Sequence, residues 1–252
     1  MFNTDGLVIK SNKYGESYRI IYVLTPEKGI IPASSRISGK INSESSSGTQ
    51  LFSYSSFSFN KRKDRYYVSS AKSLHIFYEL RKNLEKLSLA EYFSELLLEC
   101  RNDRKNEEIF RLSLNTLYFL EKGTRQSPEL LKSVFELRLL SLNGFTPDVL
   151  ACRACGKYIP ENPVFLIRGG CFYCAEHLPP ENERQGDRLF PISKNTLHAI
   201  RYIVLSDLNK IFSFRVSLET EKELGKFSEE FARWQLSRKF PALEFYKSIK
   251  SR

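Results

Sequence analysis

Short apolar segments separated by turn residues fill the first 70 residues of the chain. These segments are rich in β-branched and aromatic residues, a composition typical of strands, and the turns between them contain Gly, Pro, Ser and charged residues. The predicted strands are residues 6–10, 19–24, 29–33, 51–59 and 65–68. Because five short strands precede any helical pattern, they predict a small Greek-key barrel of the OB type.

The fourth predicted strand changes phase along its length. Its aromatic residues alternate at Phe52 and Tyr54 and then at Phe57 and Phe59. This shift predicts a bulge, or a strand that bends between two faces. Residues 38–49, just before it, are nearly all small and polar, and predict a mobile connecting loop.

From residue 73 onward, apolar residues recur every three or four positions, which is the helical period. The pattern predicts helices at about 73–100, 106–121, 127–143, 193–206 and 218–238. The third has a clear start, because Ser127 is a good N-cap and Pro128 suits the first turn, and Gly144 can end it. The last carries a stripe of four large apolar side chains, at Leu224, Phe227, Phe231 and Trp234.

Four cysteines cluster between two of these helices. The spacing is Cys152-x2-Cys155, fifteen residues, and Cys171-x2-Cys174. Two such pairs in one short segment match the zinc-ribbon template and predict one tetrahedral zinc ion. Four thiolates leave no open position for water, so we expect this zinc to be structural. His177 could replace one cysteine, but the four thiolates complete the site without it.

The sequence therefore predicts an α+β multidomain protein. An N-terminal OB-fold barrel is followed by an α-helical bundle domain with an inserted four-cysteine, zinc-ribbon-like element. The predicted domains are 1–79 (OB-fold, nucleic-acid binding), 80–150 (first part of the helical domain), 151–178 (zinc element) and 179–252 (second part of the helical domain).

The charge of the chain favours a polyanionic partner. Lys and Arg exceed Asp and Glu by 39 to 29, a net charge of +10. Charge of this size predicts attraction to nucleic acid, although an inert basic surface is an alternative. The chain carries no secretory signal pattern and no apolar run long enough for a membrane helix, so we expect a cytoplasmic protein with no membrane partner.

Sequence motifs of catalysis are absent. The chain contains no G-x-x-x-x-G-K-[ST], G-x-G-x-x-G, H-E-x-x-H or G-x-S-x-G motif. Its three histidines, His75, His177 and His198, do not form a recognisable constellation. We therefore expect a binding protein and not an enzyme.

Several local strings, in their order and spacing, carry a family resemblance. They are Asp5–Lys10, Tyr14–Ser17, Thr25–Gly29, Gln50–Tyr54, Phe135–Leu140, Asn143–Pro147 and Cys152–Gly156. Over nearly the whole chain this resembles the bacterial DNA repair and recombination protein RecO family. The resemblance implies an OB domain, a helical domain and a zinc-finger element, with no enzymatic activity.

The resemblance also implies partners and a role. RecO-like proteins bind single- and double-stranded DNA and anneal complementary strands. With RecR they help RecA load onto DNA coated by single-strand binding protein (SSB), whose C-terminal tail they contact, which implies a nucleoid-associated location. Two departures stand out. The loop after the third strand is usually richer in Lys and Arg than the serines around Arg36 and Lys40, and the often acidic position 18 is Tyr18.

The candidate DNA-binding residues lie in the barrel, where residues 1–80 hold 11 Lys and Arg against 6 Asp and Glu. OB-folds bind single strands with a basic groove and with aromatic faces on which bases stack. The candidate cations are Lys10, Lys13, Arg19, Arg36, Lys40, Lys61, Arg62, Lys63 and Arg65, and the candidate stacking residues are Tyr14, Tyr18, Tyr66 and Tyr67. Each aromatic could instead belong to the barrel core, and the cluster from Lys61 to Arg65 could be a solvated turn.

Two other functions remain open at this point. An RNA-binding OB protein acting in translation would have the same charge. A nucleic-acid enzyme with a structural zinc would need clustered carboxylates to hold Mg²⁺, whereas Glu107–Glu108 and Glu229–Glu230 look like helix surface.

Overall fold

A computed structural model describes residues 1–36, 47–101, 105–123, 126–184 and 186–250. The chain forms two compact units. Unit 1 comprises residues 1–122 and 240–252, and unit 2 comprises residues 123–239. The predicted domain boundaries at 79, 150 and 178 stay a prediction, since one compact unit can hold more than one domain.

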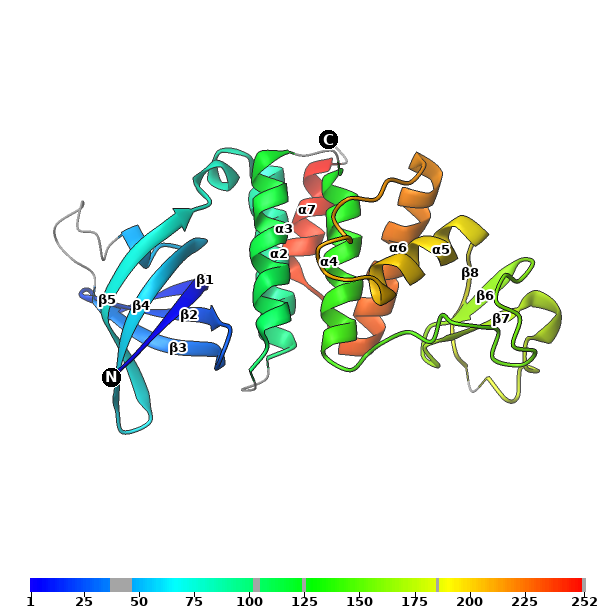
Figure 1. Cartoon of the computed structure of the whole chain (residues 1–252), viewed down its shortest axis with the longest axis horizontal. Helices are drawn as coiled ribbons and strands as arrows, with labels where there is room; N and C mark the ends of the chain where they lie inside the picture. Colours follow the sequence, from blue (N-terminus) through cyan, green and yellow to red (C-terminus); the bar gives the residue numbers. More distant parts are fainter. Residues whose placement is uncertain (37–46, 102–104, 124–125, 185, 251–252) are drawn as a thin grey trace. The chain divides into compact units, whose positions relative to one another are not determined.

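Five strands of unit 1 close into a barrel (Figure 1). They are β1 (Phe2–Tyr14), β2 (Tyr18–Thr25), β3 (Gly29–Arg36), β4 (Ser53–Arg62) and β5 (Arg65–Ile76). The order around the barrel is β1-β2-β3-β5-β4, and the β3–β5 pair is parallel whereas the other pairs are antiparallel. The predicted Greek-key barrel of the OB type is therefore confirmed.

Alternate residues of each strand fill the barrel. The buried cluster comprises Val8, Ile21, Val23, Ala33, Phe57, Phe59 and Ala71. Gly6 is required where β1 passes β2, because a Cβ atom there would lie 2.4 Å from Cγ1 of Val23. The opposite phase of β1, β2 and β3 points outward, and this outward face forms the groove described below.

The irregularity predicted in the fourth strand exists, but the extra residues lie in its partner. Within β4, Ser53, Ser55, Phe57 and Phe59 are buried at every second position, so β4 keeps its phase. The register shifts opposite Tyr54/Ser55 and Ser58/Phe59, leaving single residues of β5 unmatched. Tyr54 therefore points outward, where its ring packs 6.0 Å from Phe110.

Three α-helices complete unit 1 (Figure 1). They are α2 (Leu84–Glu99), α3 (Glu107–Lys122) and α7 (Pro241–Lys250), with a 3-10 turn, η1 (Tyr78–Lys82), after the barrel. The prediction of a helix from residue 73 was wrong, because β5 continues to Ile76 by pairing with β4 and α2 begins only after the Asn83 cap. Helix α7 was not predicted. It packs on α2, with Phe240 5.5 Å from Tyr92.

Each α-helix of unit 2 follows a serine N-cap, and the first of these, Ser127, was predicted. The helices are α4 (Pro128–Leu142), α5 (Lys194–Leu205) and α6 (Leu218–Leu236), and Ser127, Ser193 and Ser217 each accept a hydrogen bond from a backbone N–H of the first turn. Gly144 follows α4 with a φ of +92°. On α6, Leu224, Phe227 and Phe231 are buried as predicted, but Trp234 is 42% exposed.

The cysteine segment follows α4 and precedes α5 in the sequence, and it forms a small three-stranded sheet (Figure 1). Its strands are β6 (Pro163–Leu166), β7 (Cys171–Cys174) and β8 (Leu189–Pro191), in the order β7-β6-β8, and a 3-10 turn, η2 (Ala175–His177), follows β7. Phe165 of β6 packs 4.9 Å from Phe227 of α6. The predicted insertion of a cysteine element into the helical part is confirmed.

Among the described residues, no helix is long and apolar enough to cross a membrane.

Candidate nucleic-acid groove and metal centre

A groove of about 850 Å³ runs over the outer face of the barrel where β3 and β5 meet. It is lined by Tyr14, Tyr18, Ile20, Pro32, Ala33, Ser34, Asn60, Arg62, Asp64, Arg65, Tyr66, Tyr67, Val68 and Ser69. These residues come from all five strands and from two hairpin ends, β1–β2 and β4–β5. In OB-folds the same strand face and the same two hairpins hold oligonucleotides.

Strand register explains why two exposed tyrosines lie at one end of this groove. Tyr14 is paired with Tyr18 across the β1–β2 hairpin, and Tyr18 is paired with Arg36 of β3. The three residues therefore form one row across three strands, on the outward face. Tyr14 is 65% exposed and Tyr18 43%. Two predicted stacking residues thus have free ring surface beside a predicted cation.

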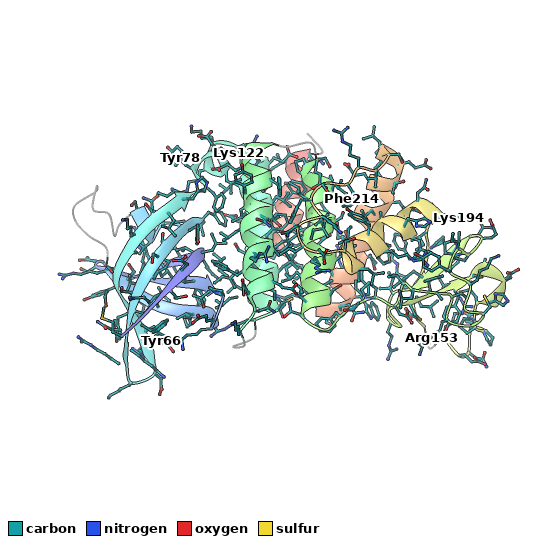
Figure 2. All side chains as sticks on the ribbon, in the orientation of Figure 1. Tyr66, Tyr78, Lys122, Arg153, Lys194 and Phe214 are labelled. Carbon is teal, nitrogen blue, oxygen red and sulfur yellow. The ribbon has the colours of Figure 1, made fainter. Side chains whose placement is uncertain are left out.

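The β4–β5 hairpin supplies the other end of the groove. Arg62 and Arg65 pair across it, and the Arg62 guanidinium lies 5.9 Å from the ring centre of Tyr67. Asp64 lies between them, so the hairpin is basic on balance. Tyr66 is less free, because its ring packs 5.6 Å from Phe2 (Figure 2 shows its place on the barrel). Tyr66 is therefore partly a core residue, which was the alternative for each aromatic.

The remaining predicted cations lie on different faces of their strands. Lys10 lies on the outward face opposite Tyr22, with its Nζ 5.9 Å from that ring. Lys13 and Arg19 pair with each other one residue out of phase with the tyrosine row, so they project from the other face. Arg19 is half-buried.

Three cations remain. Lys61 lies over the ring of Tyr66 at 5.7 Å, and Lys63 is exposed at the hairpin tip with a φ of +52°. Lys40 lies outside the described residues, as does most of the predicted loop at 38–49.

Asn60 and the apolar residues Ile20 and Pro32 line the groove but were not predicted. The strand pairing that brings them together is not visible in the sequence.

The first cysteine pair lies in a tight turn in unit 2. The Gly156 N–H donates to the carbonyl oxygen of Cys152 at 2.9 Å, and Gly156 has a φ of +71°, which favours glycine. Arg201 of α5 holds this segment, because its guanidinium donates to the carbonyl oxygens of Leu150 and Tyr158 at 3.1 and 2.6 Å. The turn is thereby fixed in place on α5.

Three of the four predicted cysteines come together, and a histidine joins them. Cys152, Cys155, Cys174 and His177 offer ligand atoms that all lie within 4.8 Å of one another. Sγ of Cys155 is 3.7 Å from Sγ of Cys174, close to the edge of about 3.8 Å expected for a ZnS tetrahedron. Cys171 is not in this group. His177 could have been found from its spacing, since Cys174-x2-His177 repeats that of Cys152-x2-Cys155.

The electrostatics of this group suit a divalent cation. Burial acts to raise the pKa of the Cys152 thiol, but backbone N–H groups of Cys155, Cys174 and Ala154 outweigh it and lower the pKa to about 6. Burial, together with hydrogen bonds to Cys152 and Cys155, raises the pKa of Cys174 to about 12. A bound metal ion would supply the positive charge that a second and third thiolate need. The donor set fits zinc, which takes sulfur and nitrogen ligands.

The chain is similar to known proteins along almost its full length. Residues 1–77 match the family model described as "Recombination protein O N terminal", and residues 81–244 match "Recombination protein O C terminal". A "DNA repair protein RecO" of Acetivibrio thermocellus is 34% identical over 98% of this chain and 96% of that protein. Those of Caldicellulosiruptor saccharolyticus (97% of each chain) and Alkaliphilus metalliredigens (99% of this chain, 100% of that protein) are 30% and 28% identical.

Proposed function

This chain belongs to the recombination protein O (RecO) family, and from that premise we propose that it is a DNA repair mediator without catalytic activity. It binds single- and double-stranded DNA through the barrel groove and anneals complementary strands. The observation that carries this proposal is the convergence of Tyr14, Tyr18, Arg62 and Arg65 on one groove.

The groove supports binding that does not read sequence. Any base can stack on an exposed tyrosine ring, and each such contact is worth about 1–3 kcal/mol. Arg62 and Arg65 at one end, and Arg36 beside Tyr18, are placed to contact successive phosphates. Because these contacts are to rings and phosphates, the groove would hold many sequences with similar affinity.

Annealing follows from the same contacts. Two DNA strands repel each other through their phosphates, and basic side chains that neutralise phosphates lower this repulsion. The protein would therefore accelerate pairing without nucleotide hydrolysis. The net charge of +10 supports this role, since the second strand can bind the basic surface outside the groove.

The protein partners we propose rest on family membership. They are RecR, the SSB C-terminal tail and, indirectly, RecA, and this role places the protein in the cytoplasm at the nucleoid.

For the acidic tail, which ends in an apolar residue, unit 2 offers a hollow of about 460 Å³ between α5 and the start of α6. Tyr202, Phe214 and Val216 supply apolar surface there, and Arg215 and His198 edge it (Figure 2 labels Phe214). Arg215→Ala should weaken binding of a tail peptide, measured by fluorescence anisotropy.

We propose one structural zinc ion in the cysteine segment. Four protein ligands close the coordination sphere of the ion, so it would cross-link the turn at Cys152 to the sheet and supply no reaction chemistry. The segment needs such a cross-link because its strands are only three or four residues long.

The test is strand annealing by the zinc-loaded protein on complementary oligonucleotides coated with SSB, with no nucleotide present. We expect accelerated annealing that weakens steeply as salt rises. Equal or tighter binding to RNA than to DNA, without annealing, would favour the RNA-binding alternative. Nucleotide-dependent or Mg²⁺-dependent turnover of the DNA would favour an enzyme. A binding curve that does not change with salt would contradict the groove mechanism.

A further inference from the structure

The geometry points to His177, and not Cys171, as the fourth ligand of the metal centre. We infer a Cys3His site made of Cys152, Cys155, Cys174 and His177. This inference deepens the proposed zinc site and rests on it. It replaces the four-thiolate set that the two Cys-x2-Cys spacings predict, and it follows from how β7 is paired.

Strand β7 separates its two cysteines. It pairs with β6 along its whole length, from Cys171 opposite Leu166 to Cys174 opposite Pro163. Side chains alternate along a strand, so residues three apart point to opposite faces. The burial agrees, because Phe172 and Cys174 are buried whereas Cys171 and Tyr173 are half-buried. Two cysteines in a paired strand cannot both bind one ion, whereas two cysteines in a turn can.

The surroundings of Cys171 confirm that it faces other groups. Its side chain is hydrogen-bonded to that of Tyr173, and it interacts electrostatically with Arg153, Asp148 and Asp187. Asp187 accepts hydrogen bonds from the backbone N–H groups of Arg168 and Gly169, both at 2.7 Å, in the turn that leads into β7. This turn therefore holds Cys171 in its present direction.

A second pair of ligands also needs a turn between its two members, and the turn lies after β7, between Cys174 and His177. The 3-10 turn η2 begins directly after Cys174 and ends at His177, which returns the imidazole to the thiols. Cys174 also links the two halves of the site, because its backbone N–H donates to Sγ of Cys152 at 3.3 Å. Each half then has the same form: a ligand, two residues of turn, and a second ligand.

Zinc content of purified variants tests the assignment. Cys171→Ser should bind one zinc per chain with unchanged affinity in a chelator competition. His177→Ala should bind zinc more weakly by more than the roughly 10- to 100-fold that loss of a second-shell group costs. Matched controls are Cys100→Ser and His198→Ala, which remove a cysteine and a histidine outside the group. Circular dichroism would show whether each variant folds.

Cobalt substitution gives an independent count of thiolates, since the intensity of the sulfur-to-cobalt charge-transfer band grows with their number. The band should be unchanged in Cys171→Ser and should rise by about a third in His177→Cys, where four thiolates replace three. A lower band in Cys171→Ser, with zinc binding unaffected by His177→Ala, would overturn the assignment and restore the four-cysteine set. A native chain that binds neither metal would instead overturn the proposed zinc site itself.

Discussion

Tyr14 and Tyr18 lie directly opposite each other at the end of the β1–β2 hairpin, on the outward face of the barrel. Both side chains are exposed, Tyr14 more than Tyr18, and both line the groove. Neighbouring exposed aromatic rings offer faces on which successive bases can stack. Their pairing is the reason for the first prediction.

Replacement of Tyr14 or Tyr18 by Ala should weaken binding of single-stranded DNA. Loss of one stacked base costs about 1–3 kcal/mol, which corresponds to a roughly 5- to 150-fold higher Kd. Replacement by Phe keeps the ring and should change the Kd by less than that. The measurement is fluorescence anisotropy with a labelled oligonucleotide. Tyr118→Ala is the matched control, because Tyr118 is 47% exposed on α3 and does not line the groove. An equal loss in the control would contradict a specific role for the groove.

Arg62→Gln and Arg65→Gln should each reduce the salt dependence of DNA binding. For single strands the slope of log K against log salt falls by about 0.7 for each phosphate contact removed. Lys13→Gln removes the same charge from the β1–β2 hairpin, but Lys13 projects from the other face of the strand pair. It should leave the slope nearly unchanged. If all three variants lowered the slope equally, the binding surface would not be confined to the groove.

The buried ion pair between Lys132 and Glu136 on α4 should govern the stability of unit 2. Nζ of Lys132 is 3.1 Å from Oε1 of Glu136, and both side chains are almost fully buried. Ser228 of α6 also donates to Glu136 at 2.5 Å. Nζ of Lys132 is also 3.7 Å from Oε2 of Glu229, which is a longer ion pair. Glu136→Gln leaves the buried ammonium group with only this longer ion pair and should lower the free energy of unfolding by about 3 kcal/mol, the low end for breaking a buried pair.

A double-mutant cycle tests this pair by urea unfolding. The cycle consists of Lys132→Met, Glu136→Leu and the double variant that carries both. The double variant removes both charges, so it should be more stable than Glu136→Leu alone, which leaves the Lys132 ammonium group buried. Ser228→Ala should lose about 1.5–3 kcal/mol, the contribution of a hydrogen bond to a charged group. Additive effects of the two charge substitutions would show that the pair is not coupled.

Cys100 should resist alkylation in the native protein. Burial, together with the nearby carboxylate of Glu99, raises its pKa to about 12, and only the thiolate reacts. Below pH 9 the native thiolate fraction should be roughly 1000-fold lower than in the unfolded chain, whose thiol has a pKa of 9.0. Because the folded pKa is the higher one, this protection is complete below pH 9 and is lost as the pH rises through about 12.

Mass spectrometry of iodoacetamide-treated protein measures this difference. Cys155, which is exposed, is the internal comparison once a chelator has removed metal. Modification of Cys100 at the same rate as Cys155 at pH 8 would contradict the burial of this thiol. Unfolding in urea before treatment should make both react.

The sequence by itself determined the features that depend on residues close together in the chain. Alternating apolar residues and turn residues predicted the five strands, and Ser127 with Pro128 predicted the start of α4 to the residue. The spacing of Cys152 and Cys155 predicted a ligand pair, because the two residues between them are enough for a tight turn that brings the two thiols together. These features depend on neighbours within a few positions, so they can be predicted from the sequence.

Only the tertiary structure decided features that depend on pairing between distant segments. The pairing of β4 with β5 extended β5 to Ile76, where the apolar period had predicted a helix. Strand register divided the cations into those on the groove, such as Arg62, and those on the other face, such as Lys13. Pairing of β7 with β6 turned Cys171 away from Cys174 and left His177 beside the thiols. Side-chain direction in a strand is set by its partner strand, and that partner is not encoded in the local spacing.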